Sequence, residues 1–138
     1  MNPDRIFADT NLFLRYLTDD VSHQADAVET LLRRAATGEI TLVTNSLVIA
    51  EIVWVLETVY RLPRPSIAEK VLAILNTPGL EVGEAEVLLQ AIVWYTDQGV
   101  DFADAYHGAW MLAHGISVAY TFDRRHFRRI PGITVLHP

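Results

Sequence analysis

The chain has 138 residues, of which 51% are hydrophobic and 20% charged, and its formal net charge is −6 at pH 7. This length and balance fit one globular domain over residues 1–138 and exclude a disordered or low-complexity chain. The sequence has no cysteine, which excludes disulfides and thiolate metal sites, and its acidity argues against a generic binder of the phosphate backbone.

Short runs of β-branched and apolar residues alternate along the chain with segments of helical periodicity. In chain order the expected strands are 6–8, 41–43, 80–82 (the weakest), 117–120 and 133–136. The expected helices are 22–36, 46–60, 66–75, 84–97 and 102–114. Strands too short and apolar to face water predict a mostly parallel sheet covered by helices on both faces, a three-layer α/β/α sandwich.

Two aspartates follow expected strands. Asp9 comes directly after strand 6–8, and Asp123 follows strand 117–120 through Thr121 and Phe122. Each can instead cap a helix, and for Asp9 taken alone capping is an equally good explanation. Because parallel strands end at one edge of their sheet, where such folds carry their sites, the two positions together favour a shared site.

Glu51 is the only charged residue in the ten-residue helical window 47–56. Apolar residues occupy the positions three and four residues away on either side, so no polar stripe surrounds it. We therefore expect the Glu51 side chain to point into the protein. The alternative is a structural glutamate paired with a buried arginine or a backbone group.

Asp101 and Asp104 open the expected helix 102–114, three residues apart and on nearly one face. Acidic residues in a first turn also stabilise a helix through its dipole and its free amides, which best explains Asp101 as the N-cap. Asp104 lies between two alanines and suits a residue that faces a tightly packed cleft. Several converging carboxylates usually imply a cation, because burying unpaired charge is costly.

In this order, the motifs Asp9-Thr10-Asn11, Ser46 with Glu51, Asp104-Ala105 and Thr121-x-Asp123 resemble the PIN-domain family, and more narrowly its VapC-type toxins. The resemblance covers essentially the whole chain. It implies that the four acids are the catalytic residues and hold Mg²⁺ or Mn²⁺, directly or through water. The supporting polar residues that it implies are Asn11, Ser46 and Thr121, and the part of Asp101 stays open.

The resemblance implies a metal-dependent endoribonuclease, the toxin of a type II toxin–antitoxin system, which hydrolyses phosphodiester bonds in single-stranded or looped RNA. It also implies a small VapB-like antitoxin and a homodimer. A local cationic cluster could neutralise the RNA backbone, or could be a solvated turn. Its members are Arg124, Arg125, Arg128 and Arg129, of which Arg125 stands where some relatives have a further acid.

Two other classes of protein fit the sequence less well. A phosphoacceptor signalling domain would need paired acids after the first strand and a lysine after the last, whereas Lys70 is the only lysine. A non-catalytic RNA-binding or protein-interaction module with the same fold is the remaining alternative, and a complete acidic set argues against it. With no apolar run long enough to span a bilayer and no evident secretory signal, we expect a cytoplasmic protein.

Overall fold

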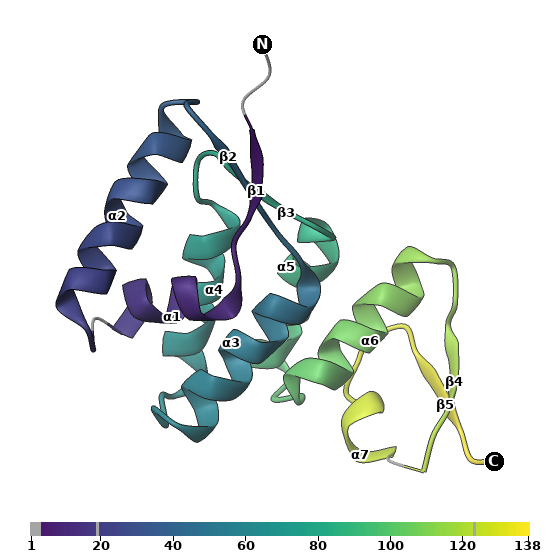
Figure 1. The fold of residues 1–138 in the computed structure, drawn as a ribbon. Coiled ribbons are helices and arrows are strands. Elements are labelled where there is room, and N and C mark those ends of the chain that lie inside the picture. The colour runs from purple at the N-terminus through teal and green to yellow at the C-terminus, as the bar shows by residue number, and fades with distance from the viewer. Residues whose placement is uncertain (1–3, 19, 123) are drawn as a thin grey trace.

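The computed structural model describes residues 4–18, 20–122 and 124–138, in which strands alternate with helices (Figure 1). The elements in chain order are β1 (Arg5–Phe7), α1 (Thr10–Thr18), α2 (Ser22–Ala36), β2 (Thr41–Thr44), α3 (Ser46–Thr58), α4 (Arg64–Leu75), β3 (Leu80–Val82), α5 (Ala85–Asp97), α6 (Phe102–Ala113), β4 (Val118–Tyr120), α7 (Arg124–Phe127) and β5 (Thr134–Leu136). All five expected strands are confirmed, the weakest one included. None of the described helices is long and apolar enough to cross a membrane.

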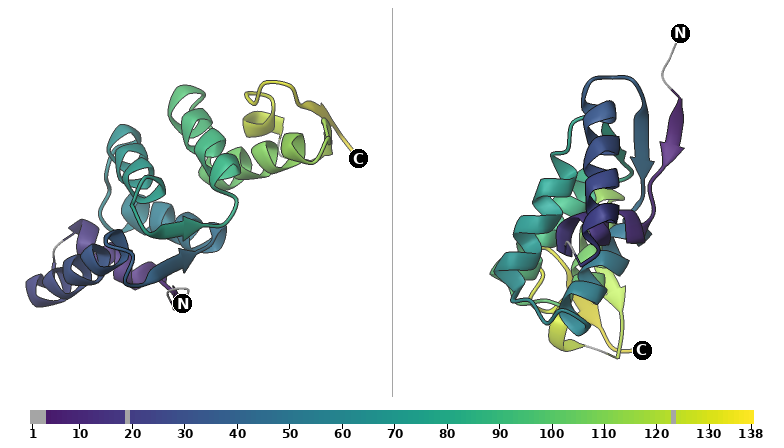
Figure 2. Two further views of the ribbon diagram at one scale, coloured as in Figure 1. Left: turned by 90° about the horizontal axis from the view of Figure 1, so that it is seen from above. Right: turned by 60° about the vertical axis from the view of Figure 1, so that its left-hand side comes forward.

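The strands are parallel, and the expected α/β class is confirmed. β2 pairs with β1 on one side and with β3 on the other, so that Leu42 lies between Ile6 and Leu80. β4 and β5 form a separate parallel pair, with Ala119 opposite Val135. The single central sheet that the sequence suggested is therefore divided into two in this structure. Figures 1 and 2 show α6, α7, β4 and β5 grouped together, away from the β1–β3 sheet.

This division corrects the expectation that every strand is shielded from water. All three residues of β1 are exposed, and so are the first and last residues of β4. β2 differs because it is the central strand, and its Leu42 and Thr44 are buried. The exposed strands are those with a sheet neighbour on one side only.

The main core lies among the helices. Buried side chains of α3, α4 and α5 pack together, among them Ile52, Leu56, Val71, Ile92 and Tyr95. α3 begins at Ser46 because Asn45 caps it: the Asn45 side chain accepts the N–H of Val48 at 3.1 Å, which satisfies one of the free amides of the first turn.

The ends of β1 and β2 are held together by a buried polar contact. Thr44 is 2% exposed, and its hydroxyl donates to the carbonyl of Ala8 at 2.9 Å. The N–H of Ala8 in turn donates to the carbonyl of Val43 at 2.8 Å. Because both strands end together here, Asp9 at the start of α1 and Ser46 at the start of α3 leave the same edge of the sheet.

A single arginine organises the connection between α5 and α6. Arg64, the first residue of α4, donates from Nη1 to the carbonyls of Tyr95 at 2.9 Å and Val100 at 2.7 Å. Its guanidinium also lies 4.3 Å from the centre of the Tyr95 ring. The ring of Phe102 contacts Tyr95 edge-on, with 6.0 Å between centroids, so the first turn of α6 is anchored on α5.

Candidate active site

Asp9 lies exposed between β1 and α1, and it caps that helix. Its Oδ1 accepts the N–H of Leu12 at 3.2 Å. The sequence left N-capping open as an explanation of Asp9, and this contact confirms it for one carboxylate oxygen, Oδ1. It also holds the carboxylate at the end of β1, where the sequence placed a candidate ligand.

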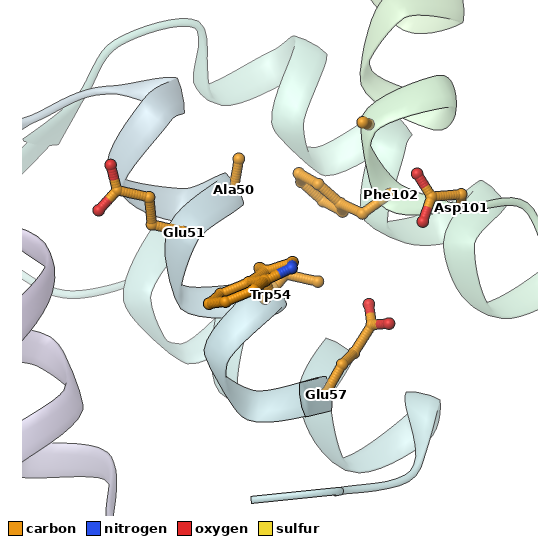
Figure 3. Close-up of a pocket in the computed structure, with 8 residues that line it drawn as sticks. Ala50, Glu51, Trp54, Glu57, Asp101 and Phe102 are labelled. Carbon is orange, nitrogen blue, oxygen red and sulfur yellow. The ribbon is translucent and has the colours of Figure 1, made fainter. Parts of the chain in front are cut away.

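Glu51 lies beside this junction, brought there by the second turn of α3. Its Oε2 accepts a hydrogen bond of 2.8 Å from the hydroxyl of Thr10, the residue that follows Asp9. The structure therefore brings together two acidic positions that are 42 residues apart in the sequence. Figure 3 shows the Glu51 carboxylate pointing away from α6.

The expectation that Glu51 points into the protein is wrong, because the residue is exposed. Its apolar neighbours on that side of α3, Leu47 and Trp54, are exposed too, at 67% and 64%. The helix is apolar around Glu51 because one face packs in the core and another lines an open cleft. Periodicity alone does not separate these two situations.

The cleft lies between α3 and α6 and has a volume of ≈ 290 Å³. Glu51, Trp54 and Glu57 line it from α3, and Asp101 and Phe102 from the start of α6. Figure 3 shows Glu51 and Asp101 on opposite sides of the Trp54 indole. The two candidate acids nearest the cleft therefore do not meet.

Asp101 occupies the N-cap position of α6, as expected, but its side chain makes no capping hydrogen bond. Its backbone N–H instead donates to Nδ1 of His126 at 3.2 Å, which ties the start of α6 to α7. Asp104 is half-buried in the first turn of α6. Asp123 lies outside the described residues, so its assignment stays a prediction.

The described residues were tested against a metal site. Carboxylate oxygens are the hard donors that Mg²⁺ and Mn²⁺ prefer, so the chemistry of the predicted ligands suits these ions. Over 4–18, 20–122 and 124–138, however, no three acidic or histidine side chains are close enough to share an ion. Asp9 and Glu51 lie at one place and Asp104 at another. The described acids alone therefore do not form a complete metal site, and Asp123, the fourth predicted ligand, lies outside the described residues.

The predicted supporting residues have separate surroundings. Asn11 is exposed in the first turn of α1. Ser46 donates from its hydroxyl to Oε1 of Glu84 at 2.6 Å rather than to a predicted ligand. Thr121 is half-buried after β4, and its N–H donates to the carbonyl of Leu136 at 3.1 Å.

Glu84 is an acidic residue that the sequence reasoning missed. The hydroxyls of Ser46 and Tyr106 both donate to its Oε1, each at 2.6 Å, and these hydrogen bonds lower the pKa of Glu84. Burial, and then the bond to Glu84, raises the pKa of Tyr106. A signal was available, because Glu84 follows β3 by two residues just as Asp9 follows β1.

The cationic cluster lies at and after α7. Arg125 and Arg128 are exposed, and the side chain of Arg124 lies outside the described part of the structure. Arg129 is exposed as well, and its Nη1 donates to the carbonyl of Gly99 at 3.2 Å, so it also supports the link between α5 and α6.

The sequence was compared with known families and structures. The family described as PIN domain matches residues 6–133, from β1 to the residue before β5. The chain belongs to the PIN-domain family. The match includes most of β1, all of β2, β3 and β4, and all four predicted acids.

Two solved structures align along nearly the whole chain. VapC20 from Mycobacterium tuberculosis, described as a Sarcin-Ricin loop cleaving toxin, is 22% identical, with 96% of this chain and 99% of that chain covered and a TM-score of 0.38. VapBC2 from Rickettsia felis, bound to a DNA fragment from its promoter, is 15% identical, with coverages of 97% and 98% and a TM-score of 0.37. No curated protein matches the sequence.

Proposed function

We propose that this PIN-domain chain is a VapC-like endoribonuclease that requires Mg²⁺ or Mn²⁺, the toxin of a toxin–antitoxin pair, and that it hydrolyses phosphodiester bonds in single-stranded or looped RNA. The observation that carries the proposal is the hydrogen bond from Thr10 to Glu51. It places the acids of two distant motifs, Asp9 and Glu51, at the end of β1 in a chain of this family.

In the proposal, Asp9, Glu51, Asp104 and Asp123 are the residues that would hold the ion. A divalent metal supplies such a reaction with an activated water and with charge stabilisation at the phosphate. The chain's own contribution is orientation: the amide of Leu12 fixes one oxygen of Asp9, and the hydroxyl of Thr10 fixes one oxygen of Glu51. Both contacts limit the rotation of the carboxylates before any ligand arrives.

The proposed partners are RNA, a small antitoxin and a second subunit. Exposed Arg125 and Arg128 offer positive charge to an RNA backbone. An acidic protein needs such a local positive region to bind a polyanion. Exposed Leu47 and Trp54 beside the candidate site offer apolar surface to a small antitoxin or to a second subunit. A homodimer and a VapB-like antitoxin are proposed here from the family resemblance.

The test is cleavage of a single-stranded RNA by the purified chain, with Mg²⁺ or Mn²⁺ and with chelator. We expect metal-dependent cleavage that falls by at least about 100-fold in Asp9→Asn. Asp26→Asn is the matched control, because Asp26 is an exposed aspartate on α2 and outside the candidate site. It should cleave like the wild type.

Binding can be followed in the same samples without any substrate. An ion that binds the folded chain raises its melting temperature, and we expect this rise in the wild type and Asp26→Asn but not in Asp9→Asn. RNA that is retained but never cut under any metal condition would favour the non-catalytic binding module instead.

A further inference from the structure

A second hollow adjoins the cleft described above. It has a volume of ≈ 280 Å³ and lies between α3 and α6. Its apolar and aromatic lining comes from Leu47 and Ala50 on α3 and from Phe102, Tyr106 and His107 on α6. Ala50 and Phe102 line both hollows, and Figure 3 shows the Phe102 ring pointing toward Ala50. Walls of aromatic rings and aliphatic groups suit a flat ring, such as an unstacked nucleobase.

The polar part of this lining is built around Glu84. Ser46 and Tyr106 line the hollow, and both hydroxyls donate to Oε1 of Glu84, each at 2.6 Å. The lowered pKa of Glu84 keeps its carboxylate ionised at neutral pH, and an ionised carboxylate has no hydrogen to donate. Each hydroxyl has one hydrogen, so both hydrogens are committed to Glu84. The two hydroxyls keep only their lone pairs for a ligand.

Glu84 adds a further acceptor beside the two hydroxyls. Its side chain is exposed, and in the part of the chain that the structure describes nothing donates to its second oxygen, Oε2. Its φ of 58° is a left-handed conformation that a residue with a side chain seldom adopts, and such residues gather at functional sites. Ser46, Glu84 and Tyr106, called the acceptor cluster below, therefore offer a ligand only acceptors and one negative charge.

A group of acceptors selects a ligand edge that carries donors. Among the four RNA bases, guanine has its ring N1–H next to the amino group on C2, which gives adjacent donors. Adenine and cytosine carry their amino group beside an acceptor nitrogen, and uracil has its N–H between two carbonyls. We propose that the hollow between α3 and α6 binds an unpaired guanine base, whose N1–H and amino group donate to the acceptor cluster. The RNA that supplies the base rests on the proposed nuclease function.

The position of the hollow suits a strand that also reaches the candidate site. Ser46 and Glu51 are five residues apart on α3, which corresponds to about 7.5 Å along the helix axis. A nucleotide whose base fills the hollow would thus have its backbone near Glu51. Single-stranded RNA is read in this way, because unstacked bases present both a flat face and a hydrogen-bonding edge.

A guanidinium group of a protein partner carries a donor edge like that of guanine. The hollow favours the base, because its volume and its aromatic lining suit a larger ring system. The two ligands are also separable by experiment, since removing the amino group from guanine gives hypoxanthine, the base of inosine. Hypoxanthine keeps the ring and the N1–H and lacks only one donor group.

The first test compares bases on the unmodified protein. End-labelled pentanucleotides carry four uridines and a central guanosine, inosine, adenosine, cytidine or uridine, and their Kd values are measured by fluorescence anisotropy in chelator. We expect guanosine to bind at least about 10-fold more tightly than inosine, because inosine loses a hydrogen bond to a charged group. Uridine, adenosine and cytidine should also bind more weakly than guanosine. Equal affinities, or no measurable binding of any RNA, would overturn the proposal.

Substitutions then test the acceptor cluster. Glu84→Gln replaces an acceptor oxygen by a donor, and Tyr106→Phe removes one hydroxyl while keeping the ring. Both should abolish the preference for guanosine over inosine and leave the affinity for the uridine pentanucleotide unchanged. Glu86→Gln is the matched control, because Glu86 is an exposed acid on α5 that lines a different hollow, between α5 and α6. It should keep the preference.

A guanosine preference that survives in folded Glu84→Gln would overturn the proposal. Thermal unfolding shows whether each variant folds, and the base series on the unmodified protein decides the question if one does not. An arginine-containing pentapeptide is the probe for the guanidinium alternative. If it binds in a manner that depends on Glu84 while guanosine and inosine bind alike, the hollow takes a protein side chain and the proposal is wrong.

The binding series is independent of RNA cleavage. Metal-dependent cleavage by a chain that shows no guanosine preference would remove this inference and leave the proposed function in place. A guanosine preference in a chain that never cleaves RNA would do the reverse, because the hollow would then serve a binding module.

Discussion

Gly79, just before β3, is a position where one added methyl group should destabilise the fold. Its φ is +78°, and a Cβ built there would lie 2.2 Å from the carbonyl oxygen of Ala35 in the last turn of α2. That oxygen also accepts the N–H of Gly38 at 3.0 Å, and the carbonyl of Gly79 accepts the N–H of Leu42 at 2.9 Å. Gly79→Ala therefore disturbs the end of α2 and the junction of β2 with β3 together.

Gly38 gives the matched control because it shares the backbone strain without the clash. Its φ is +82°, and nothing lies within 4 Å of a Cβ built there. Alanine at either position should cost about 1–2 kcal/mol for the left-handed conformation. Only Gly79→Ala adds overpacking, worth about 1–3 kcal/mol.

The assay is thermal and urea unfolding of the two variants beside the wild type. For a chain of this size 1 kcal/mol corresponds to about 4 °C, so Gly79→Ala should melt about 4–12 °C below Gly38→Ala. Equal losses in the two variants would show that Ala35 can give way, and would refute the reasoning from the close approach.

Three other substitutions test particular contacts. Asn45→Ala removes the cap of α3 and should lower the unfolding free energy by about 1 kcal/mol in urea titrations. Arg64→Ala removes two charge-assisted hydrogen bonds at the α5–α6 connection and should lower it by about 2 kcal/mol, and a loss below about 0.5 kcal/mol would contradict that account. The hydroxyls of Ser46 and Tyr106 hold the pKa of Glu84 below its ordinary value of 4.5. The two hydrogen bonds therefore stabilise the folded chain fully above pH 4.5, and this stabilisation is lost as the pH falls through the lowered pKa. Glu84→Gln should therefore lose less stability than the wild type between about pH 5 and pH 3, and identical pH profiles would contradict the assignment.

The order and type of the five strands and of α2 to α6 could be read from the sequence because each depends on local composition, whereas α1 and α7 are not among the expected helices. Strand 80–82 was the weakest expectation and is present, since Leu80 and Val82 are both partly buried beside β2. The division of the strands into two sheets could not be read in the same way. A strand of three residues offers too few alternating positions to specify its neighbour or its register.

In the candidate site, too, features that depend on local sequence could be predicted and others could not. That Asp9 ends a strand follows from its position in the sequence, and so does its capping contact. The exposure of Glu51 could not be predicted. Leu47 and Trp54 surround it with apolar residues in the sequence, a pattern that is typical of a buried helix. Glu84 is the first residue of the expected helix 84–97, which hides its place after a strand, whereas its φ of 58° places it before α5.

The contacts of Arg64 set the geometry of any motion of the C-terminal segment. Since this side chain fixes Tyr95 and Val100, α6 must turn about a point beyond Val100. α6 has 12 residues and is therefore about 18 Å long. A rotation of a helix of that length by about 10° moves its C-terminal end by about 3 Å, which is most of the spacing between two strands. A substitution at Arg64 would thus change the position of β4 without touching β4 itself.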